Sequence, residues 1–270
     1  MKHLTKLLST LTLLLGLTTA MIAQEEASAV ELYNEGLAKL KAKEYDAALD
    51  LMKQALEAVD PESETDVKVE SVAKKNGPIA AFYSGNAARK AEDFDKALAA
   101  YDDGIAMNPG FYGNYLGRAQ ALDGKGEDVL AVTAFIEAGE MAEKSPKNAP
   151  KAQQYYSKAE KYCGIAYGKK EYDQAIALGE AFLAKRETAD AYYYTAAAQL
   201  KTNKASDALA HATKAAEMGA ESEDSGKYYM LKGEVLEALG QKSEAVAAFK
   251  MISSGKYAER AKYKIDQLNK

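Results

Sequence analysis

The chain has 270 residues, with 35 basic and 40 acidic side chains and a formal net charge of −5. Because charges of both signs are interspersed, no overall field attracts nucleic acid or an anionic membrane surface, and neither is an expected direct partner. A single cysteine cannot form a disulfide within the chain, so the stability of the fold has to come from packing.

The first predicted element is a secretory signal over residues 1–23. Lys2 and Lys6 precede an apolar run that small residues close at Ala23, which is the layout of a signal peptide. Cleavage after Ala23 is favoured over cleavage after Ala20. A retained membrane anchor is the weaker interpretation, because a run of about 17 residues is at the lower edge of what spans a bilayer.

We therefore expect residues 24–270 to form a periplasmic or secreted protein that meets the membrane only through a partner. Removing residues 1–23 removes two lysines and no acid, which leaves 33 basic against 40 acidic residues, a net charge of about −7. His211 is then the one remaining histidine, so multi-histidine metal sites are excluded by count. We predict that His211 faces solvent on a helix and that Cys163 is a small buried hydrophobe.

A short pattern of an aromatic residue, an acid and two apolar residues recurs along the chain. It is clearest in residues 43–49, 92–98 and 170–176, and weaker copies begin at Lys204 and Lys242. The acids of the three clear copies, which are Asp46, Asp95 and Asp173, fall where a second helix would begin and where an acid favours the helix dipole.

A small residue precedes each copy and has an alanine twelve residues after it. The five pairs are Gly36 with Ala48, Gly85 with Ala97, Cys163 with Ala175, Ala196 with Ala208, and Gly233 with Ala245. A sixth pair, Gly117 with Ala131, fits if two residues are inserted. A small residue lets two helices approach closely while a bulky neighbour fills the space beside it, so each copy predicts a packed pair of amphipathic helices.

Together these features resemble the tetratricopeptide repeat, whose helix pairs recur about every 34 residues. The intervals between the alanines are 49, 34, 44, 33 and 37 residues, so some units carry insertions. The resemblance implies an all-α fold, a right-handed superhelical solenoid of about six helix pairs plus a C-terminal capping helix. The expected units are residues 29–61, 78–110, 111–145, 152–187, 189–222 and 226–256, and the capping helix is 257–268.

The two longest intervals predict irregular segments. Residues 61–77 and 144–150 are rich in polar residues and proline, and a surface loop is favoured over an extended helix end in both. Asn76, Gly77 and Pro78 predict a turn followed by a helix start.

The resemblance also implies a groove formed by the first helix of each unit. Residues three before, one after and four after each small residue share one stripe of that helix. The candidate partner-binding residues on this stripe are Tyr33, Phe82, Asn86, Arg89, Asn114, Arg118, Tyr167 and Tyr193. The stripe begins with aromatic, Asn and Arg side chains and becomes acidic in the final unit, at Glu234 and Glu237.

We accordingly expect a non-enzymatic scaffold or adaptor of the cell envelope that binds a peptide or helix of a protein partner in the groove. The alternative is a carrier that binds a glycan or another small ligand on the tyrosines. Some family members clamp a C-terminal carboxylate, but only Asn86 and Arg118 match that pattern of residues. No carboxylate pair stands out as catalytic, and no metal or cofactor is expected.

Overall fold

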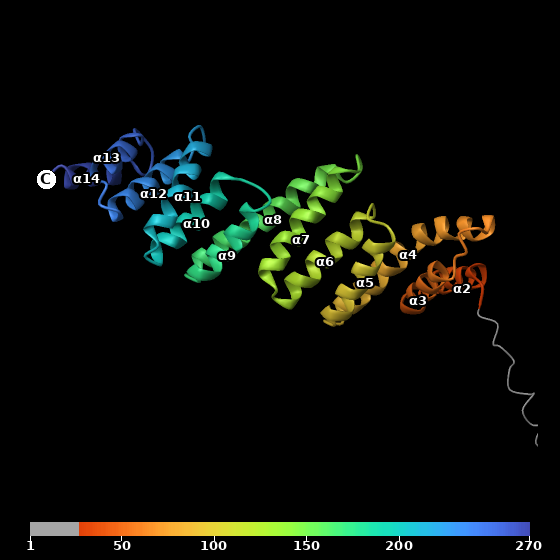
Figure 1. The fold of residues 1–270 in the computed structure, drawn as a ribbon. Helices are drawn as coiled ribbons and strands as arrows, with labels where there is room; N and C mark the ends of the chain where they lie inside the picture. Colours follow the sequence, from red (N-terminus) through yellow and green to blue (C-terminus); the bar gives the residue numbers. More distant parts are fainter. Residues whose placement is uncertain (1–26) are drawn as a thin grey trace, which may run out of the picture.

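The computed structural model describes residues 27–270 (Figure 1). The signal predicted over residues 1–23 lies outside them. Within the described residues the chain forms helices and turns and contains no strand. The helices are α2 (Ala29–Lys41), α3 (Tyr45–Glu57), α4 (Glu64–Lys90), α5 (Phe94–Met107), α6 (Tyr112–Lys125), α7 (Asp128–Glu143), α8 (Ala149–Gly168), α9 (Tyr172–Leu183), α10 (Ala189–Lys201), α11 (Ala205–Met218), α12 (Ser225–Ala238), α13 (Lys242–Lys250) and α14 (Ala258–Leu268).

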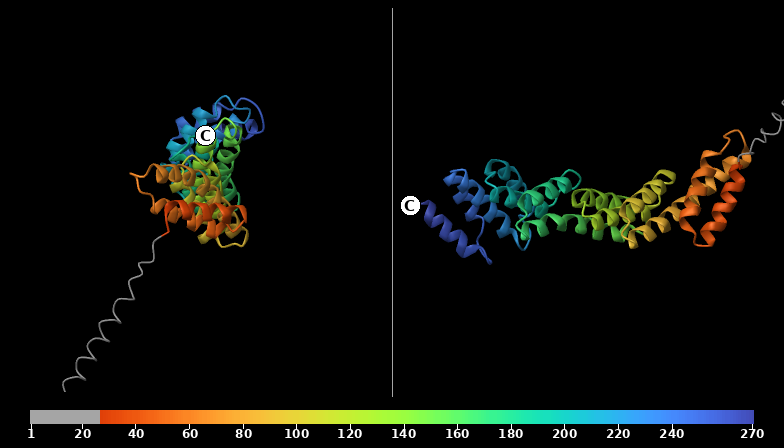
Figure 2. Two further views of the ribbon diagram at one scale, coloured as in Figure 1. Left: turned by 90° about the vertical axis from the view of Figure 1, so that its right-hand side faces the viewer. Right: turned by 90° about the horizontal axis from the view of Figure 1, so that it is seen from below.

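Consecutive helices pack in pairs, and the pairs stack into an elongated solenoid. Each even-numbered helix from α2 to α12 packs against the helix that follows it, and each second helix also contacts the first helix of the next pair. The stack runs from α2 at one end to α14 at the other (Figures 1 and 2). The predicted all-α repeat solenoid is therefore confirmed.

The turn inside each pair is the same in all six. The first or second residue after the first helix takes a left-handed conformation, and the next N–H donates to a carbonyl five residues back, which closes the helix end. The left-handed residues are Lys43, Glu92, Gly126, Lys170, Asn203 and Gly240. As predicted, Asp46, Asp95 and Asp173 lie in the first turn of the helices that follow.

The packing within each pair follows the predicted alternation of small and bulky residues. A methyl group added to Gly85 or Gly117 would collide with the ring of Tyr101, which is fully buried. Gly233 receives Phe249 in the same way. The glycines therefore give the bulky side chains the space that lets neighbouring helices approach.

The prediction of a loop over residues 61–77 is wrong for most of that segment. Helix α4 begins at Glu64 and continues through Pro78 to Lys90. Val69 and Ala73 are buried on the same face as Ala80, so an apolar stripe of helical spacing passes straight through the proline. Ser63 caps the helix by accepting the N–H of Asp66. In the second segment, residues 144–148 form turns, and α8 already begins at Ala149.

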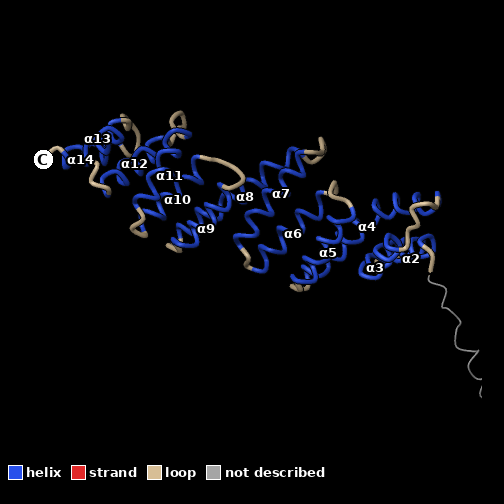
Figure 3. The backbone as a smooth tube through the Cα atoms, in the orientation of Figure 1, coloured by secondary structure: helices blue, strands red, loops and turns tan. Residues whose placement is uncertain are grey.

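The first helices form two rows. They contact one another at α2–α4 and α4–α6, and again at α8–α10 and α10–α12. The third and fourth pairs meet instead through the second helix α7, which packs against both α8 and α9. A hollow of about 410 Å³ lies at this point and is lined by residues of α6, α7 and α8, including Leu116, Phe135 and Tyr155. The tube in Figure 3 follows the chain through this region.

None of the helices in the described part of the chain is both long and apolar enough to cross a membrane.

Candidate functional site

The first row, formed by α2, α4 and α6, carries six of the eight candidate residues, and most of them are engaged within the fold. Tyr33 accepts a hydrogen bond from Asn76 Nδ2 at 2.9 Å. Phe82 is partly buried, with its ring edge-on to Phe111 at a centroid distance of 5.9 Å. Both side chains join neighbouring helices, so they stabilise the row and present only part of their surface.

Asn86 and Arg89 lie beside the hydroxyl of Tyr101. The Tyr101 ring comes from the second helix α5 and packs against Gly85 of α4 and Gly117 of α6. Its hydroxyl donates to Asn86 Oδ1 at 3.0 Å, and Arg89 Nη2 lies 3.4 Å from the same oxygen. Burial raises the pKa of Tyr101, so the phenol stays a donor. Asn86 is thus committed to the packing of the repeat.

Asn114 has to be corrected from a groove residue to a core residue. It is 0% exposed, and its Nδ2 donates to the carbonyl oxygen of Pro78 at 3.1 Å. Gly104 lies directly against its amide. The Pro78 carbonyl belongs to α4, the first helix of the preceding pair, so the bond joins two first helices.

Arg118 is held between two acids. Its guanidinium pairs with Asp102 at 3.2 Å and with Glu137, and it lies 5.7 Å from the centroid of the Tyr115 ring. Two carboxylates therefore compensate a charge that the sequence suggested was available to a partner.

The second row brings the remaining candidates together. Tyr167 of α8 and Tyr193 of α10 line one hollow of about 210 Å³ between α8, α10, α12 and the start of α14. Four more of its lining residues belong to the predicted stripe, namely Ala197, Leu200, Met230 and Glu234. The stripe therefore forms a real concavity in the second row.

Four polar side chains of this hollow were not among the candidates: Lys201, Lys227, Tyr257 and Arg260. The last two come from the capping helix and the residue before it. Since α14 follows α13 as the next first helix would, its first turn could have been expected to extend the stripe.

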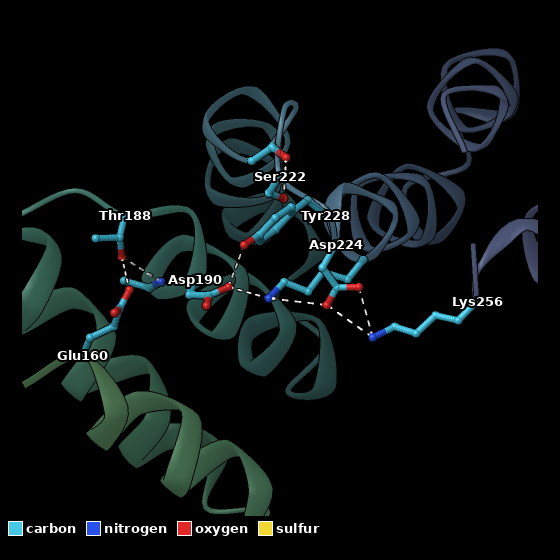
Figure 4. A network of polar contacts seen from close by, with 10 residues as sticks. Glu160, Thr188, Asp190, Ser222, Asp224, Tyr228 and Lys256 are labelled. Carbon is cyan, nitrogen blue, oxygen red and sulfur yellow. Dashed lines mark hydrogen bonds and ion pairs between the residues drawn. The ribbon is translucent and has the colours of Figure 1, made fainter. Parts of the chain in front are cut away.

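Lys227 is held by a network of polar contacts in which Asp190, Asp224 and Tyr228 take part; these three side chains are labelled in Figure 4. Its ammonium pairs with Asp190 at 2.6 Å, and Asp190 also accepts the hydroxyl of Tyr228 at 2.7 Å. Burial alone would lower the pKa of Lys227, but the hydrogen bond and the charge of Asp190 outweigh it and raise the pKa. Lys227 is thus a charged group in a fixed position, with its side chain only 16% exposed.

The sequence suggested that the stripe is acidic in the final unit, and this prediction is wrong. Arg260 of α14 pairs with Glu234, and Lys264 of the same helix pairs with Glu237 at 2.6 Å. Burial raises the pKa of Glu234 despite the nearby cations. The capping helix therefore neutralises the two acids that gave the predicted stripe its negative end.

The described residues hold no cluster of three or more metal-binding side chains. Cys163 is 1% exposed, as predicted, and burial raises the pKa of its thiol to about 12. The prediction that His211 faces solvent is wrong. It is half-buried, with Nδ1 2.9 Å from Gln199 Oε1 and its ring beside Tyr192, and burial lowers its pKa.

Comparison with known families identifies part of the repeat array. Residues 84–149, from the second half of α4 to the start of α8, match the model of the tetratricopeptide repeat family. This segment is similar to tetratricopeptide repeats. The turns and the small-to-bulky packing of the matched tetratricopeptide repeats recur in the helix pairs on both sides of them. No curated protein sequence matches the chain.

Several solved structures are similar to the chain. A TPR repeats protein from Bacteroides fragilis has 17% identity and a TM-score of 0.40, with 90% of this chain and 98% of that chain covered. A tetratricopeptide repeat protein from Parabacteroides merdae has 16% identity and a TM-score of 0.34, covering 90% and 99%. The MamA protein has 20% identity and a TM-score of 0.35, covering 70% and 96%.

Proposed function

We propose that this protein is a non-enzymatic scaffold of the cell envelope that holds a peptide or helix of a protein partner against α8, α10, α12 and α14. The observation that carries the proposal is the hollow in the second row, where six residues of the predicted stripe line one concavity. Tetratricopeptide repeats generally serve protein–protein interaction, and the chain carries matched repeats next to this row.

The second row suits a polypeptide better than the first. In the first row Asn114 is buried, Asn86 is hydrogen-bonded within the repeat, and Arg118 is paired with two acids. The second row combines the aromatic rings of Tyr167 and Tyr193 with cations fixed at the rim. Aromatic side chains give wide contact at a small cost in conformational entropy, and fixed donors recognise backbone or side-chain oxygens.

Site-specific photo-crosslinking tests this assignment in cells. A photoreactive amino acid is placed at Tyr257, which lines the hollow, and in a second variant at Lys214, which is exposed on α11. We expect a covalent adduct with a specific polypeptide from position 257 and none from position 214. Adducts from position 214 alone, or from neither position in envelope fractions that contain the protein, would contradict the proposal.

A second measurement tests the location. The proposal expects the protein in the periplasmic or secreted fraction, with Gln24 as its first residue by mass spectrometry of the intact chain. An intact Met1 in the cytoplasmic fraction would show that residues 1–23 do not act as a secretory signal.

A further inference from the structure

The lining of the hollow in the second row carries one positive charge that no ion pair compensates. Three cations line it, Lys201, Lys227 and Arg260, against one carboxylate, Glu234. Lys227 pairs with Asp190 just outside the lining, and Arg260 pairs with Glu234, but no ion pair within residues 27–270 engages Lys201. An exposed cation without an ion-pair partner favours the approach of an anion.

The hollow also offers a neutral donor. Within residues 27–270 no hydrogen bond engages the hydroxyl of Tyr193, whose ring is edge-on to Tyr228 at a centroid distance of 5.8 Å. Burial raises the pKa of Tyr193, so its hydroxyl keeps its proton. The exposed lining is mostly polar, and Leu200 adds a small apolar surface. The ligand that fits is therefore an anionic group on a short stem.

The size of the hollow limits what can enter. Its volume of about 210 Å³ corresponds to roughly seven water molecules at about 30 Å³ each. One side chain fits in that space, but a folded element does not. A polyanion such as nucleic acid would also meet the net negative charge of the whole chain, which is −5.

We propose that the hollow receives the carboxylate of an acidic side chain, Asp or Glu, in the partner polypeptide, with Lys201, Lys227 and the hydroxyl of Tyr193 as its donors. This inference rests on the proposed function and gives it a chemical specificity. An apolar residue next to the acid contacts Leu200.

Fluorescence anisotropy with three short labelled peptides tests the proposal. The first is blocked at both ends and has Glu–Phe at its centre. The second is identical except for Gln–Phe. The third has Gln–Phe and a free C-terminal carboxylate. We expect the Glu peptide to bind about tenfold more tightly than the blocked Gln peptide, the effect of one partly buried charge-assisted hydrogen bond.

Two variants locate the effect. Lys201→Met should abolish the preference for Glu over Gln, and the matched variant Lys214→Met on the exposed face of α11 should keep it. Both lysines are exposed, and unchanged circular dichroism confirms that both variants fold. Equal binding of the Glu and Gln peptides, or a preference that survives Lys201→Met, would overturn the proposal.

The third peptide separates two sources of the same chemistry. If it binds most tightly, the hollow recognises a chain end, and the assignment to an acidic side chain is wrong. The proposed function is tested separately by the crosslink at position 257, which keeps Lys201. A partner that crosslinks there while the peptides show no preference for Glu would support the proposed function and contradict only the specificity for an acidic side chain.

Discussion

Replacement of Gly117 by alanine tests the packing that holds the repeats together. An alanine Cβ at this position would lie 2.8 Å from Tyr101 Cδ1 and closer still to two other atoms of the ring. The ring cannot move away, because a Cβ built on Gly85 would lie 2.5 Å from Tyr101 Cε1 and the side chain is 0% exposed. The substitution therefore adds volume to a site with no free space.

The expected size of the effect combines two opposing contributions. Alanine is favoured over glycine inside a helix by about 1 kcal/mol, whereas overpacking a core costs about 1–3 kcal/mol. With Tyr101 held between two glycines, we take the upper part of that range and expect Gly117→Ala to lower the free energy of unfolding by about 1–2 kcal/mol. Urea denaturation followed by circular dichroism measures this difference.

Gly168→Ala is the matched control. Gly168 is the last residue of α8, and a Cβ added there meets nothing within 4 Å, so this variant should be as stable as the wild type or slightly more stable. In a double-mutant cycle, Tyr101→Leu should relieve most of the cost of Gly117→Ala. If Gly117→Ala behaves like Gly168→Ala, the reasoning about small and bulky residues is wrong.

Three further predictions follow from the ionisable groups and the caps. Hydrogen bonds from Lys96 and Ser84 lower the pKa of Asp46 from 3.8, so the stability that this acid contributes is present above pH 3.8 and is lost as the pH falls further. The difference in stability between wild type and Asp46→Asn should shrink over that range, and a constant difference would contradict the pairing. Because burial raises the pKa of Cys163 to about 12, a thiol reagent at pH 8 should react with native protein only at the rate of unfolding. Rapid labelling in native buffer would show that the thiol is accessible. Ser63→Ala removes the cap of α4 and should cost about 1 kcal/mol, with exchange of amide hydrogens accelerated in residues 64–70; unchanged exchange there would argue against the cap.

The sequence predicted those parts of the fold that depend on local spacing. Gly85 and Gly233 mark close approaches because each lies sixteen residues before a bulky side chain that fills the space, Tyr101 and Phe249. The buried Cys163 follows from the same frame. Both residues of each such contact lie in one helix pair, so the contact can be predicted from their spacing along the chain.

The errors arise where distant segments determine the outcome. Pro78 suggested a helix start, but the apolar face through Val69 and Ala73 has α3 and α5 to pack against, and α4 continues through the proline. Asn114 looked available because the carbonyl that it bonds belongs to the preceding pair. The division of the first helices into two rows likewise depends on contacts between pairs.

The candidate site shows the same limit. Tyr167 and Tyr193 were found from the stripe, but the charge of the hollow also depends on Arg260, which pairs with Glu234 more than twenty residues earlier. Lys227 acquires its fixed position from Asp190 in the preceding pair. Residue spacing within one unit could not reveal these contributions from neighbouring units.

Hydrogen–deuterium exchange of the protein with and without its crosslinked partner, or a peptide from it, tests the central claim most directly. Binding in the second row predicts slower exchange of the backbone amides in α10, α12 and the first turn of α14. The exchange rates in α2 and α6 should not change. Protection confined to α2, α4 and α6 would contradict the account, because it would place the partner on the row whose candidate residues are engaged within the fold.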